Sequence, residues 1–289
     1  MKSKTIAFLF FSFVICTFLL IAFLLFVDRQ KSAFCKADDI KEQTQQKIHV
    51  SKQTQSISVY FTIPEYSKNK NSEIIVALKN FLNNAQKSIY GALYDLDYDP
   101  IAEILVHKFQ MGVDVKLVVE RDNSDKECLL KCKRAGIPIV DDDNSALMHN
   151  KFFVVDGSSV WTGSTNMTYN CLFLNNNNSL LIHSPQLAEN YRNEFQEMFI
   201  NHRYGMKSPR NTKYIESVVN NDVLIVNMFA PEDGVEERIV REIENTHQSV
   251  RFLAFSFTSE RIADSLIKAQ NRGVLIQGVF EKRNAGNIA

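Results

Sequence analysis

The distribution of apolar and polar residues divides the chain into three parts. An uninterrupted apolar run without a charged residue covers 6–27, and the following stretch, 28–55, is polar and rich in Gln, Lys and Thr. A run of this length can cross a bilayer as a helix, and it exceeds the usual hydrophobic core of a cleaved signal peptide. The pattern therefore predicts a transmembrane anchor or signal segment over 1–27, a polar linker over 28–55, and a folded body from residue 56 onward.

Within the body, short apolar runs that suit strands alternate with longer segments of helical periodicity. Gly112 closes one of the helical segments, and Ser184 precedes another as an N-cap. Alternation of this kind is typical of an α/β layered fold with a mixed β-sheet flanked by helices. Strands are predicted at 58–62, 87–96, 113–120, 137–140, 150–155 and 179–183, and helices at 72–86, 100–112, 124–136 and 184–199.

The body also contains an internal repeat. Residues 87–123 align with 248–284 without a gap, at a constant offset of 161 positions (262 − 101 = 161). Any two strand-helix-strand units share apolar spacing, but a gapless register with matching Gly-Val and Glu-x-x-Asn positions favours duplication. We therefore expect a first lobe over 56–205 and a linker with an incomplete second lobe over 206–289.

Polar residues stand at fixed distances on either side of the apolar run 152–155. His149 and Lys151 are separated by one residue, directly before the run 152–155. Strand side chains alternate in direction, so these two are expected to project from the same face. An imidazole beside an ammonium group forms a site for an anion, and phosphate is the obvious candidate.

The residues that follow extend this candidate phosphate site. Ser164 and Asn166 come directly after Gly163; their side chains can donate neutral hydrogen bonds to the same phosphate, and the glycine permits close approach of the backbone. His149 can act as a nucleophile or as a general acid, while Lys151 supplies a point charge. No cluster of His, Asp, Glu and Cys with ligand spacing accompanies them, so we expect no metal and no cofactor.

A single histidine beside a strand is usually structural, but six residue types at fixed spacings favour a functional site. The pattern H-x-K, four residues, D, six residues, G-S-x-N resembles the HKD motif of the phospholipase D superfamily; its members here are His149, Lys151, Asp156, Gly163, Ser164 and Asn166. The resemblance implies a phospholipase D-like fold and a metal-independent phosphodiesterase that forms a phosphohistidine intermediate. It also implies that His149, Lys151 and Asp156 are catalytic.

Many members of that superfamily carry a glutamate after the motif that steadies a catalytic histidine. In this chain Asn177, within the asparagine run 175–178, stands at the corresponding position. An amide can hydrogen-bond an imidazole, but it cannot stabilise an imidazolium by charge. We therefore expect Asn177 to support the site, with a consequence for the catalytic rate rather than for the fold.

The internal repeat predicts where a second HKD motif would lie. The same offset applied to His149 gives position 310 (149 + 161), beyond the last residue, Ala289. In the superfamily, two motifs meet across a pseudo-twofold axis and supply one nucleophile and one acid, and single-motif members form the pair by dimerising. The sequence thus indicates half a site, completed in a homodimer or in a longer protein of which this chain is a fragment.

Three functions compete. The first is a phospholipase D type enzyme that hydrolyses a phospholipid phosphodiester. The second is an exported endonuclease of the same superfamily, for which a basic, aromatic-lined groove is expected. The third is a non-catalytic relative that binds lipid or a partner. A formal net charge of zero neither supports nor excludes nucleic acid.

The lysines before the apolar run bear on localisation. Lys2 and Lys4 favour a cytoplasmic N-terminus, whereas Arg29 and Lys31 on the other side counter this assignment. We expect the chain to be membrane-anchored through 6–27 or secreted, with its body outside the cytoplasm.

Overall fold

The computed structural model describes residues 57–64, 72–142, 146–219 and 223–282. None of the helices in these ranges is long and apolar enough to cross a membrane. The predicted anchor at 6–27 and the linker at 28–55 lie outside the described residues, so both stay predictions.

The first lobe is built on one mixed sheet of seven strands in the order β1-β7-β6-β5-β2-β3-β4. Strands β2, β3 and β4 run parallel, while β1, β7, β6, β5 and β2 pair antiparallel. This arrangement confirms the predicted α/β fold with a mixed sheet. The strands are β1 (Ile57–Phe61), β2 (Ser88–Leu93), β3 (Asp114–Val119), β4 (Ile139–Asp141), β5 (Lys151–Val155), β6 (Ser159–Gly163) and β7 (Asn178–His183).

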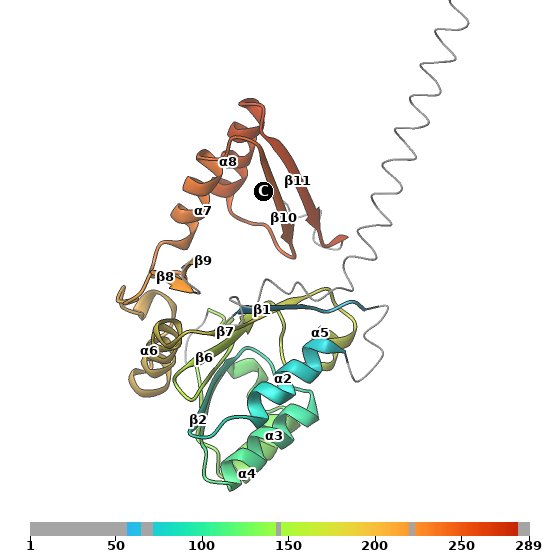
Figure 1. Cartoon of the computed structure of the whole chain (residues 1–289), viewed down its shortest axis with the longest axis vertical. Helices are drawn as coiled ribbons and strands as arrows, with labels where there is room; N and C mark the ends of the chain where they lie inside the picture. The colour runs from blue at the N-terminus through green and yellow to red at the C-terminus, as the bar shows by residue number, and fades with distance from the viewer. Residues whose placement is uncertain (1–56, 65–71, 143–145, 220–222, 283–289) are drawn as a thin grey trace, which may run out of the picture. The chain divides into compact units, whose positions relative to one another are not determined.

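Helices cover both faces of this sheet. Figure 1 shows α2 (Glu73–Asn83), α3 (Asp99–Gln110) and α4 (Glu127–Arg134) together on one side, and α6 (Pro185–Asn201) on the other. The three grouped helices pack on a large apolar cluster that includes Phe153 and Trp161, whereas Phe152 packs in a second cluster with residues of α6. Strand β5 is therefore buried on both faces, which explains its continuous apolar run.

Two short elements of the first lobe were not apparent from the pattern. Helix α5 (Tyr169–Phe173) begins after Thr168, whose side chain accepts a hydrogen bond from the Cys171 N–H at 3.2 Å. A helix of one turn leaves too little periodicity to recognise. The second element is a 3-10 turn (Arg121–Asn123), which links β3 to α4 and is also too short to recognise from the pattern.

The second lobe repeats the first at the offset found in the sequence. Its elements are β8 (Glu216–Val219), β9 (Val223–Val226), α7 (Val235–Glu244), β10 (Ser249–Ala254), α8 (Glu260–Asn271) and β11 (Leu275–Phe280). Adding 161 to the bounds of β2, α3 and β3 gives the bounds of β10, α8 and β11. Strands β10 and β11 pair in parallel, as β2 and β3 do. The repeat is thus structural, while the boundary between lobes at 205 and 206 stays a prediction.

Candidate active site

The two basic residues of the motif lie where strand β5 begins. His149 precedes the strand and Lys151 is its first residue, paired with Leu93 at the carboxyl end of β2. The Tyr94 N–H extends this pairing by donating to the Asn150 carbonyl at 2.8 Å. The residues that follow β2 therefore stand beside the residues that precede β5.

Tyr94 brings the imidazole and the ammonium group together. Its ring meets the His149 ring edge-on at a centroid distance of 4.7 Å. The Lys151 Nζ lies 4.9 Å from the centroid of the same ring and donates a hydrogen bond to the His149 carbonyl at 2.8 Å. Both predicted residues thus converge on one aromatic side chain, which carries a cation–π contact to the lysine.

The electrostatics of this pair favour a reactive state at neutral pH. Burial lowers the pKa of His149, and the neighbouring Lys151 charge lowers it further. Burial also lowers the pKa of Lys151 to about 8, against the opposing influence of Cys171 and Asp95. At neutral pH the imidazole is therefore uncharged and the lysine remains protonated.

Ser164 is fixed by residues of the asparagine run. Its hydroxyl donates to the Asn177 Oδ1 at 3.0 Å and accepts from the Asn178 N–H at 3.0 Å. Asn177 also donates through Nδ2 to the Cys171 carbonyl at 3.0 Å. Asn177 therefore supports Ser164 and helix α5, and within the described part of the chain no hydrogen bond joins it to His149.

Gly163 permits this close packing of neighbouring strands. It has a φ of 150°, and a Cβ at this position would lie 2.3 Å from the Asn178 carbonyl oxygen. Any larger residue would force β6 and β7 apart and move Ser164 with them. The close approach that was expected of the Gly163 backbone is therefore an approach to strand β7.

Asn166 and Lys151 are both close to Cys171. Its Nδ2 donates to the Cys171 Sγ at 3.5 Å, and Cys171 is close enough to Lys151 to influence its pKa. The Asn166 Oδ1 is buried and has no hydrogen-bond donor among the described residues. Lys151 and Asn166 thus flank the same thiol.

Asp156 lies at the opposite end of β5, and the structure does not bring it to His149. Asp156 comes five residues after Lys151, the first residue of β5, which separates these two by roughly 16 Å, and His149 lies before Lys151. Its carboxylate accepts the N–H groups of Gln86, Lys87 and Ser88 at 2.7–3.1 Å. Burial alone raises the pKa of Asp156, but these hydrogen bonds outweigh it and hold the pKa below its ordinary value. These contacts fix the start of β2 against the end of β5.

Sequence reasoning did not identify Tyr94 or Glu120. The Glu120 carboxylate is buried and accepts the Met148 N–H at 2.7 Å, one residue before His149. Burial raises the pKa of Glu120 above its ordinary value. Tyr94 follows β2, the neighbour of β5, and Glu120 follows β3, the next strand of the sheet, so the strand order would have been needed to find them. The Glu-x-x-Asn match in the repeat was the only signal.

Replacing Tyr94 by alanine is expected to lower kcat about tenfold, because His149 and Lys151 lose the ring that orients both. The same change exposes Lys151 and should raise its pKa, moving the alkaline limit of activity upward. Tyr94→Phe keeps the ring and should preserve both values. Steady-state kinetics as a function of pH on the two variants would check this; equal losses in both would contradict a role for the ring.

Comparison with known proteins places this geometry in a family. Residues 78–199 match the family model described as "Cardiolipin synthase, PLD-like domain". A phospholipase D of Rickettsia typhi (strain ATCC VR-144 / Wilmington) is 30% identical over 141 residues, which cover 46% of this chain and 69% of the relative. The chain belongs to the phospholipase D superfamily.

A second relative agrees with this family, and a solved structure agrees with the fold. The mitochondrial cardiolipin hydrolase of Chlamydomonas reinhardtii is 25% identical over 122 residues, 42% of this chain, and the chain spans 55% of that relative's length. Phosphatidylserine synthase of Haemophilus influenzae Rd KW20 has a TM-score of 0.57 at 12% identity, covering 80% of this chain and 62% of its own. That structure supports the phospholipase D fold.

Proposed function

We propose that the chain is a phosphodiesterase that hydrolyses the phosphodiester bond of a phospholipid through a phosphohistidine at His149, without a metal ion. The observation that carries the proposal is the convergence of an uncharged imidazole and a protonated lysine on Tyr94. The HKD motif of the phospholipase D superfamily supplies the chemistry for which this pair is suited.

The proposed reaction has two steps. The His149 nitrogen attacks phosphorus, a P–N bond forms, and the P–O bond to the leaving alcohol breaks as that oxygen takes a proton from an acid. Water then attacks the phosphohistidine and gives a proton to the deprotonated acid of the first step, the P–N bond breaks, and the phosphate ester departs. In this proposal Lys151 holds the phosphate oxygens by charge, and Ser164 and Asn166 turn from their present partners, Asn177 and Cys171, to donate hydrogen bonds as charge builds on those oxygens.

A phospholipid is favoured as substrate because the matched relatives are named as a phospholipase D and a cardiolipin hydrolase. The apolar run 6–27 would also keep the body at a membrane surface. The test is release of head group from phosphatidylcholine, phosphatidylglycerol and cardiolipin vesicles by the full chain in EDTA. Cleavage of plasmid DNA but of no lipid would assign the nuclease function instead, and cleavage of neither would favour a binding protein.

The pH dependence of kcat/KM follows from the two shifted groups. His149 must be neutral to attack, so activity should rise through its pKa, which lies below the ordinary histidine value. At higher pH two protons are lost: the acid that serves the leaving oxygen is deprotonated, and Lys151, which must be charged to hold phosphate, titrates with a pKa of about 8. Lys151→Arg should remove the part of the alkaline fall that lies near pH 8, because arginine stays charged. An unchanged alkaline limb in Lys151→Arg would assign it to another group.

We propose further that the acid in the first step is His149 of a second copy of the chain. The described residues contain one HKD motif, and a twofold pair would supply one nucleophile and one acid. Mixing wild type with a rising excess of His149→Asn chain tests this arrangement. Activity per wild-type chain should fall as mixed dimers form; constant activity per wild-type chain would contradict it.

For localisation, we propose a membrane-anchored chain whose body lies outside the cytoplasm. The support is the uncharged run 6–27 with Lys2 and Lys4 before it. Carbonate extraction should leave the full chain in the membrane fraction, and added protease should reach the body in spheroplasts. Recovery in the soluble fraction would favour a cleaved signal.

A further inference from the structure

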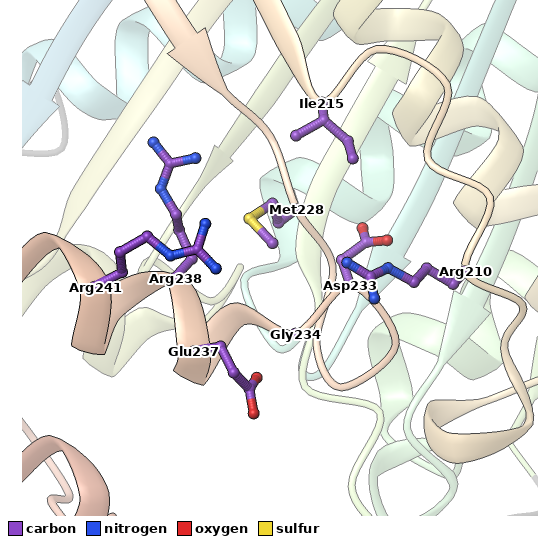
Figure 2. Close-up of a pocket in the computed structure, with 8 residues that line it drawn as sticks. All are labelled: Arg210, Ile215, Met228, Asp233, Gly234, Glu237, Arg238 and Arg241. Atoms are coloured by element: carbon purple, nitrogen blue, oxygen red, sulfur yellow. The ribbon is translucent and has the colours of Figure 1, made fainter.

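A pocket of about 350 Å³ lies between the segment before β8 and helix α7, away from the HKD motif. Its volume falls at the lower end of the range for small-molecule sites. Figure 2 shows Arg238 and Arg241 on one side of Met228 and Arg210 on the other. The lining residues are Arg210, Ile215, Met228, Asp233, Gly234, Glu237, Arg238 and Arg241.

Two of these arginines are available to a ligand. Arg210 and Arg241 are exposed and form no ion pair within the part of the chain that the structure describes. Arg238 forms an ion pair with Glu242 at 2.6 Å, one turn further along α7. Because residues three apart share a helix face, Arg238 and Arg241 present two guanidinium groups together.

Both acidic residues of the pocket contact other parts of the protein. Glu237 forms an ion pair with Arg261 at 2.7 Å, and Figure 2 shows its carboxylate directed away from the arginines of α7. Asp233 is 1% exposed, and its Oδ2 accepts from the Thr212 hydroxyl at 2.6 Å and the Phe229 N–H at 2.8 Å, while its buried Oδ1 has no hydrogen-bond donor among the described residues. These bonds hold the loop that leads into α7.

Glu194, which lies near Asp233, adds little negative charge to the pocket. Burial, together with the neighbouring Glu232, raises the pKa of Glu194 to about 8. Glu194 is therefore protonated at neutral pH and does not oppose an anion in front of Asp233. The arginines of the site that form no ion pair among the described residues are Arg210 and Arg241, and the charge of Arg210 also acts on Glu237.

We propose that this pocket binds the phosphate group of a small phosphoester. A tetrahedral phosphate offers acceptor oxygens in several directions, so it can meet guanidinium groups from both sides, each in bidentate geometry. Ile215 and Met228 line the same pocket and offer apolar surface that suits the carbon part of the ester. The site is separate from His149 and would act as a second phosphate site of the chain.

The test is calorimetric titration of the full chain with glycerol 3-phosphate. It is carried out in a Lys151→Gln background, so that the HKD site contributes less to the signal. Arg210→Gln and Arg241→Gln should each weaken binding about tenfold. Arg251→Gln, which removes an exposed charge on β10, is the matched control and should change affinity less than about twofold.

Two further ligands identify the source of the phosphate. Tighter binding of dihexanoyl phosphatidic acid than of glycerol 3-phosphate would assign a lipid head group, and equal binding would assign a soluble phosphoester. Binding that is unchanged in both pocket variants, or weakened equally by Arg251→Gln, would overturn the proposal. So would binding of a DNA oligonucleotide without any binding of glycerol 3-phosphate.

Discussion

Replacing His149 by asparagine is expected to reduce phosphodiesterase activity roughly a thousandfold. Asparagine is close in size, so the contact with Tyr94 is partly kept, but it can neither attack phosphorus nor carry a proton. In the proposed homodimer the change removes the nucleophile and the acid together. The measurement is steady-state hydrolysis of bis(p-nitrophenyl) phosphate and of the best phospholipid substrate.

His107→Gln is the matched control for this experiment. His107 is exposed on α3 and does not contact the motif, so its replacement should leave kcat unchanged. Circular dichroism on both variants establishes that the sheet is intact. If His149→Asn retained more than about a tenth of the activity, His149 would be neither nucleophile nor general acid.

Replacing Asp156 by alanine should destabilise the first lobe by about 2 kcal/mol, because three N–H groups at the start of β2 lose their acceptor. Asp156 also has a φ of 54°, which asparagine tolerates better than alanine. Asp156→Asn should therefore lose less stability. Urea unfolding of the full chain measures both changes.

The pH dependence of this contribution has a defined sign. Since the folded-state pKa of Asp156 is lowered, its contribution is present above the unfolded-state pKa and is lost as pH falls through the folded-state value. The acid loss of stability should be smaller in Asp156→Asn. Where the variants remain folded, kcat should change only a few-fold, since the carboxylate is roughly 16 Å from the start of β5. A loss as large as that of His149→Asn, without unfolding, would show that Asp156 acts in the chemistry.

Local signals in the sequence predicted much of the first lobe and both copies of the repeat. The run after Lys151 predicted β5, and the gapless match to 248–284 predicted β10, α8 and β11. The H-x-K spacing predicted that His149 and Lys151 project from the same face of a strand, because side-chain direction in a strand repeats every two residues. Local pattern was sufficient wherever the relevant contacts are close in the chain.

Long-range contacts explain what the sequence did not predict. Tyr94 reaches His149 because β2 is the antiparallel neighbour of β5, a pairing that no spacing reveals. Asp156 belongs to the motif in sequence, yet the length of β5 carries it away from the histidine. Asn177 contacts Ser164 because β7 is the neighbour of β6. Each of these placements depends on strand order rather than on residue type.

Rapid-quench trapping shows whether His149 forms a covalent bond to phosphorus. The substrate is bis(p-nitrophenyl) phosphate in EDTA, because nitrophenolate leaves without a general acid and the result does not depend on a second histidine. We expect a burst of about one nitrophenolate per chain and an acid-labile phosphoryl adduct on the peptide that contains His149. Turnover without a burst, or an adduct on any other residue, would contradict it.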